Sequence, residues 1–133
     1  MIKAIIFDCF GVLTTEGWDA FCDTFLSDKP GKLKEAKELL GKLNLGYIQY
    51  SDFLKKVSNI AGVSTKEASK YIDNNVANKK IFSYIKNQLK PVYKIGMLSN
   101  AGDNWLDELF TREQINLFDD IVLSYTTGTA KPD

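Results

Sequence analysis

Hydrophobic positions in this chain follow two patterns. Three largely apolar segments, at residues 2–8, 92–98 and 121–123, predict β-strands. Between the first two runs, apolar side chains recur every three to four positions, which is typical of amphipathic helices. Because strands separated by helices form parallel sheets, the pattern predicts an α/β fold with a parallel sheet of three visible strands. The length of the first apolar run favours a strand that is buried on both faces.

The helical region between the first two strands carries its own start and stop residues. Asp28 to Gly31 is turn chemistry that ends a first helix. Ser51 can cap a third helix that Gly62 ends, and Ser64 with Glu67 has the pattern of a capping box. We therefore expect five helices, at residues 18–26, 33–43, 51–60, 64–72 and 78–89.

The last third of the chain predicts one more helix and a loop. Asp103 is expected to start a helix that carries Trp105, Leu106 and Leu109. Residues 124–133 are polar and are expected to form a loop.

The long helical insert sets the predicted domain organisation. Residues 15–89 leave the sheet directly after the first strand, so we expect them to form a helical cap over that edge of the sheet. Residues 1–14 and 90–133 then form the core that contains the strands. The alternative is that the insert is a second helical layer with no role in a site.

Composition excludes several classes of function. Seventeen basic and 17 acidic residues give a formal net charge of zero, which provides no field for nucleic acid or an anionic membrane surface. The absence of His excludes Ser-His catalysis and His-based metal sites. Arg112 is the only Arg, so a phosphate site has to use Lys or backbone N–H groups. Two cysteines, no signal-peptide pattern and no apolar run long enough for a bilayer predict a cytoplasmic protein.

Polar side chains follow the predicted strands at positions where chemistry is possible. Asp8 ends the first strand and Gly11 allows a sharp turn after it. Ser99 and Asn100 end the second strand, and Lys131 lies in the loop after the third. Each alone has a common structural explanation: a turn residue, a loop or a solvated lysine. Because the carboxyl ends of parallel strands share one edge of a sheet, their order in the chain predicts one site there.

Together these segments resemble the haloacid dehalogenase (HAD) superfamily. The first motif is FDCFGVL at residues 7–13, the second is GMLSNAG at residues 96–102, and the third runs from Gly128 to Asp133. The resemblance covers the whole chain. It implies a Rossmann-like sheet with an inserted helical cap, and the hydrolysis of a small phosphorylated metabolite.

The resemblance also implies roles for individual residues. Asp8 would be the nucleophile that forms an aspartyl-phosphate, Ser99 would hydrogen-bond the phosphoryl oxygens, and Lys131 would offset their charge. Asn100 and Gly11 would help to bind substrate. Mg²⁺ would be held by Asp8, the backbone carbonyl of Phe10 and further acidic residues.

Phe10 departs from the phosphatase pattern. Phosphatases of the superfamily usually carry at this position an Asp that protonates the leaving group, which Phe cannot do. The 2-haloacid dehalogenase branch carries an aromatic residue there, so dehalogenation is an alternative function. That branch uses a cap Arg, however, and residues 14–90 contain none. A non-catalytic binding module on the same fold is the other alternative.

The superfamily's fourth motif lies beyond Lys131 and supplies further metal ligands. The sequence ends at Asp133, so we expect a truncated core, an incomplete Mg²⁺ site and impaired turnover. Residues 2–8 are then expected to be an exposed edge through which the chain self-associates. Whether these residues are a natural product or a fragment is left open, and so is the identity of the substrate.

Overall fold

The computed structural model describes residues 1–132, and its strands form a three-stranded parallel sheet. β1 (Ala4–Phe7) pairs with β2 (Lys94–Ser99), which pairs in turn with β3 (Asp120–Leu123). Ile5 lies opposite Ile95 in this register. The predicted α/β class and all three strands are confirmed, with strand ends shifted by a few residues.

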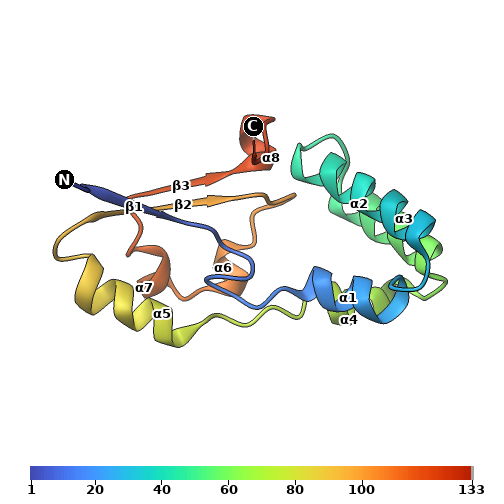
Figure 1. Cartoon of the computed structure of the whole chain (residues 1–133), viewed down its shortest axis with the longest axis horizontal. Helices are drawn as coiled ribbons and strands as arrows, with labels where there is room; N and C mark the ends of the chain where they lie inside the picture. Colours follow the sequence, from blue (N-terminus) through green and yellow to red (C-terminus); the bar gives the residue numbers. More distant parts are fainter. Residues whose placement is uncertain (133) are drawn as a thin grey trace.

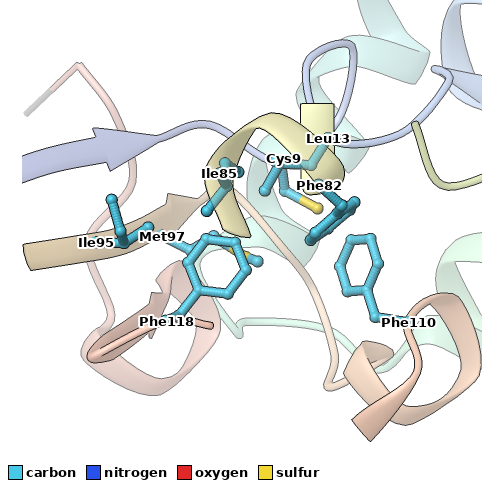
Figure 2. Packing of buried hydrophobic residues seen from close by; sticks show 8 residues of the cluster. All are labelled: Cys9, Leu13, Phe82, Ile85, Ile95, Met97, Phe110 and Phe118. Atoms are coloured by element: carbon cyan, nitrogen blue, oxygen red, sulfur yellow. The ribbon is translucent and has the colours of Figure 1, made fainter. Parts of the chain in front are cut away.

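Short helices cover one face of the sheet (Figure 1). They are α5 (Lys79–Tyr84), the π-helical turn η1 (Ile85–Leu89), α6 (Leu106–Leu109) and α7 (Arg112–Ile115). Side chains from β2 and these helical segments meet in one buried cluster, with Phe82 packed 5.2 Å from Phe110 between ring centres (Figure 2). The buried members of this cluster are Cys9, Leu13, Phe82, Ile85, Ile95, Met97, Phe110 and Phe118.

The other face of β1 is open, which corrects the prediction of a strand buried on both faces. Ile5 and Phe7 pack against the core cluster, whereas Ile6 is 68% exposed. Within residues 1–132, no helix lies over Ile6, and β1 pairs with β2 alone. The apolar run therefore has an uncovered face and an unpaired edge in the part of the chain that the structure describes.

Four helices form a separate bundle beyond the carboxyl ends of the strands (Figure 1). This helical cap consists of α1 (Gly17–Phe25), α2 (Pro30–Asn44), α3 (Tyr50–Ala61) and α4 (Thr65–Ile72). Two predicted helix ends are confirmed: the Ser64 hydroxyl accepts a hydrogen bond from the Glu67 N–H, and Gly62 ends α3 at φ +73°. Ser51 does not cap α3, because the helix already begins at Tyr50. The cap has its own apolar core, with Phe21, Phe53 and Val57 fully buried.

Two adjacent chain segments connect the cap to the sheet. Thr14 and Ala77 form an antiparallel bridge, and the Thr15 N–H donates to the Val76 carbonyl at 3.0 Å. We expected the cap to extend to residue 89. Phe82 and Ile85 pack with the sheet, however, so the cap ends before α5 in this structure.

Two local expectations near the end of the chain are wrong, and one helix there was not predicted. Asp103 does not start a helix: α6 begins at Leu106, where the Asn104 side chain accepts a hydrogen bond from the Leu106 N–H at 3.2 Å. α7 follows a Thr111–Gln114 capping box that we had not identified. Residues 124–127 form the single helical turn α8 (Ser124–Thr127) rather than loop.

Among the described residues, no helix is long and apolar enough to cross a membrane.

Candidate functional site

Three loops at the carboxyl edge of the sheet bring Asp8, Asn100 and Lys131 together. The Lys131 ammonium donates to Asp8 Oδ1 at 2.7 Å and to the Leu98 carbonyl at 3.0 Å. Asn100 holds the Lys131 backbone at both ends: its Oδ1 accepts from the Lys131 N–H at 2.8 Å, and its Nδ2 donates to the Lys131 carbonyl at 3.2 Å. The lysine is therefore fixed at its backbone and its ammonium group, although residue 131 is far from residue 8 in sequence.

A tight turn follows Asp8 and returns the chain to the same site. The Asp8 carboxylate accepts from the Cys9 N–H at 2.8 Å. Gly11 adopts φ +80°, and its N–H donates to the Thr14 carbonyl at 2.9 Å. Gly11 therefore shapes this turn, and it does not line the cavity that lies between the sheet edge and the cap.

A cavity of about 890 Å³ lies between the sheet edge and the cap. Asp8, Asn100 and Lys131 line it from the core, together with the side chain of Phe10. Trp18 and Tyr50 line it from the cap. The volume lies within the range typical of small-molecule sites.

Glu16 is a second carboxyl in this cavity. It directly precedes α1, at the end of the turn that begins at Asp8. Burial raises the pKa of Glu16, and the charges of Asp19 and Asp8 raise it further. Its carboxyl group is therefore more readily protonated than a solvated glutamate.

Cys9, next to Asp8, is a poor nucleophile. Its thiol is buried, and burial together with the Asp8 charge raises its pKa to about 12. The neutral thiol is thus retained near neutral pH. Asp8 is the exposed nucleophilic group at this position.

The structure does not place Ser99 on the cavity wall. Its residue is 2% exposed, and it occupies the same side of β2 as Ile95 and Met97. Its hydroxyl is buried and has no hydrogen-bond partner among residues 1–132. The role expected for Ser99 stays a prediction, and Asp133, the last residue of the third motif, lies outside the described residues.

The described residues do not fit the expected Mg²⁺ site. Within residues 1–132, no three Asp, Glu, Cys or His side chains come close enough to hold a metal ion. Asp8 supplies one carboxylate, of which Oδ1 already accepts from Lys131 and Cys9. Asp119 lies at the opposite edge of the sheet, where it accepts from the Ile95 N–H at 2.8 Å and pairs with Lys90.

Two groups of residues near the site were not predicted from the sequence. Glu16 and Trp105 line the cavity, but their positions depend on turns that a linear pattern does not reveal. Ser124 joins core and cap, because its hydroxyl contacts the Asn44 carbonyl of α2 and accepts from the Ala101 N–H at 2.9 Å. The polar character of residues 124–127 was the only indication of that contact.

Solved structures of known proteins share this fold, whereas no protein-family model and no curated protein sequence matches the chain. A HAD family enzyme, bt-2542 of Bacteroides thetaiotaomicron, is similar at 19% identity and a TM-score of 0.73, over 99% of this chain and 73% of that one. Another structure of that enzyme is a magnesium complex, at 20% identity and a TM-score of 0.71, over 99% of this chain and 72% of that one.

Two further structures extend the comparison. A predicted HAD-like family hydrolase of Porphyromonas gingivalis is similar at 23% identity and a TM-score of 0.65, over 100% of this chain and 71% of that one. A 2-haloacid dehalogenase of Pseudomonas syringae pv. Tomato is similar at 16% identity and a TM-score of 0.52, over 100% of this chain and 68% of that one. This chain has the fold of the HAD-family hydrolases.

Proposed function

We propose that this protein hydrolyses phosphate monoesters, with Asp8 as the nucleophile. The observation that carries the proposal is the contact between Lys131 and Asp8, at the wall of a cavity large enough for a metabolite. An ammonium group beside a carboxylate lets an anionic phosphate approach it, because the lysine offsets the repulsion between the two.

The reaction follows from these two side chains. An Asp8 carboxylate oxygen attacks phosphorus, the bond from phosphorus to the ester oxygen breaks, and an aspartyl-phosphate forms. Water then attacks the phosphorus of this intermediate, which breaks its bond to Asp8 and releases phosphate. The Leu98 carbonyl and Asn100 hold Lys131 in place during both steps. The described residues do not assemble the ligands of a metal ion, so each step of this scheme is assigned to side chains and water.

The leaving oxygen needs a proton, which Phe10 cannot supply. Glu16 lines the same cavity, and its raised pKa favours the protonated acid. In the proposed scheme, Glu16 protonates the leaving oxygen in the first step. Its carboxylate then takes a proton from the attacking water in the second.

The test is phosphate release from p-nitrophenyl phosphate, measured with and without added Mg²⁺. We expect low turnover by the wild-type chain, because the described residues do not complete a Mg²⁺ site, and loss of that turnover in Asp8→Asn. Asp28→Asn is the matched control on an exposed surface away from the cavity. Equal turnover by Asp8→Asn and the wild type would rule out Asp8 as the nucleophile.

Dehalogenation of 2-haloacids is the second candidate, and Phe10 is the observation that favours it. An aromatic side chain lies on the cavity wall beside the nucleophile, and a solved 2-haloacid dehalogenase has a similar fold. Chloride release from 2-chloropropionate, without phosphate release from phosphate esters, would support this candidate. The absence of both reactions would favour a binding module.

A further inference from the structure

Aromatic rings line the cavity from the nucleophile loop to the cap. Phe10 packs edge-to-face on Trp105 with ring centres 5.4 Å apart, and Trp105 packs in the same manner on Tyr50 at 6.3 Å. Tyr50 and Trp18 each contact Phe53, at 6.1 and 5.7 Å. The five rings thus form a continuous wall that starts two residues after Asp8 and ends inside the cap.

These rings do more than fill a core. Phe53 is fully buried, which is sufficient to explain it as a packing residue. Phe10, Trp18, Tyr50 and Trp105 are only partly buried, and all four line the cavity. Part of each ring surface is therefore available to a ligand that occupies the 890 Å³ beside Asp8.

The charges on the wall restrict that ligand further. Lys131 is the only cationic side chain among the described residues that line the cavity, and Asp8 already pairs with it. The other charged groups of the wall are carboxyls: Glu16, Asp73, Asp103 and Glu108. Besides the phosphate that approaches Lys131, a second anionic group on a ligand would find no partner and would be repelled.

We infer that the site selects a phosphate monoester whose organic part is an aromatic ring without a second anionic group. This inference rests on the proposed function for the position of the phosphate. Ring-to-ring contacts with Trp105 and Tyr50 would hold the organic part, while Lys131 receives the phosphate. Sugar bisphosphates and phosphorylated carboxylic acids are excluded as preferred substrates.

Binding of phosphonates tests the inference without requiring turnover. Benzylphosphonate retains the ring and the anion but has no ester bond to break. The two tryptophans of the chain, Trp18 and Trp105, both line the cavity, so their fluorescence reports occupancy. We expect benzylphosphonate to bind about tenfold more tightly than methylphosphonate, and 4-carboxybenzylphosphonate to bind about tenfold more weakly than benzylphosphonate.

Variants at Tyr50 separate contact with the ligand from packing, with binding measured by calorimetry. Tyr50→Phe keeps the ring and loses only the hydroxyl that donates to Asp73, so its affinity for benzylphosphonate should stay within about twofold. Tyr50→Leu should lose about 3- to 10-fold in affinity for benzylphosphonate and little for methylphosphonate. Tyr47→Leu is the matched control, because Tyr47 is 70% exposed and does not line the cavity. Circular dichroism confirms that each variant is folded.

The outcomes distinguish this inference from the proposed function. Equal affinity for benzyl- and methylphosphonate, or tighter binding of the carboxylated ligand, would overturn the inference even if the protein hydrolyses p-nitrophenyl phosphate. A ring preference that depends on Tyr50, in a protein without phosphatase turnover, would support the inference and refute the proposed function. Failure of benzylphosphonate to bind at all would also overturn the inference.

Discussion

Replacement of Lys131 by Met should impair turnover far more than it impairs folding. At the observed 2.7 Å from Asp8, a single ion pair is worth about 1.5 kcal/mol in bulk water. The two side chains are 35% and 49% exposed, so the net contribution to the free energy of unfolding should be below about 1 kcal/mol. The same ammonium faces the charge that develops when phosphate meets Asp8, and loss of such a group costs about 10²- to 10³-fold in rate.

The assay compares two Lys→Met variants by phosphate release and by urea unfolding. Lys90→Met is the matched control: Lys90 pairs with Asp119 at 2.9 Å, and these side chains are 32% and 35% exposed. That pair lies at the opposite edge of the sheet from Asp8, so Lys90→Met should leave turnover unchanged. Binding of benzylphosphonate provides a second readout, which Lys131→Met should weaken and Lys90→Met should not.

Two results would refute this reasoning about Lys131. One is turnover by Lys131→Met within a few-fold of the wild type, because the lysine would then not stabilise the transition state. The other is an equal loss of turnover in Lys90→Met, because the effect would then reflect the loss of a surface charge rather than the position of Lys131.

The remaining predictions concern the acid, the cap and the sheet edge. Glu16→Gln should slow hydrolysis of alkyl phosphates about 10²- to 10⁴-fold and p-nitrophenyl phosphate much less; equal effects would contradict the acid role. Burial raises the pKa of Glu16 in the folded protein. The stability that Glu16 contributes is therefore present below the ordinary pKa of a glutamate and is lost as pH rises through the raised pKa. Glu16→Gln should then raise the urea midpoint at neutral pH. Gly17→Ala should cost about 1–3 kcal/mol in urea unfolding, because its Cβ would lie 2.3 Å from the Tyr71 carbonyl oxygen, whereas the unobstructed Gly41→Ala should not destabilise. We propose that the open edge of β1 pairs with a second copy, so light scattering should show an oligomer that Ile6→Lys weakens; a wild-type monomer would contradict this.

The sequence predicted the strands and most helices because their determinants are local. The segments before Asp8 and Ser99 are largely apolar, and Ser64 and Gly62 have the residue types that helix ends require. The helix start predicted at Asp103 was wrong, because the Asn104 side chain accepts the hydrogen bond from the Leu106 N–H at the first residue of α6. The exposure of Ile6 could not be predicted, because it depends on what covers the sheet rather than on the strand itself.

The candidate site was predictable only at its sheet edge. Parallel strands bring Asp8, Asn100 and Lys131 together by topology, and the structure joins all three by hydrogen bonds. Glu16 and Trp105 reach the cavity through a turn and a loop whose paths are set by tertiary contacts. The position of Ser99 depends on the side of β2 that it faces, which follows the core packing of Ile95 and Met97.

The most direct test of Asp8 as the nucleophile is to trap the covalent intermediate. Wild-type protein is mixed with p-nitrophenyl phosphate, quenched in acid, digested and analysed by mass spectrometry. We predict one phosphoryl group on the peptide that contains Asp8, and none in Asp8→Asn. Phosphate release by the wild type without a phosphorylated Asp8 peptide, and with undiminished turnover in Asp8→Asn, would contradict the account.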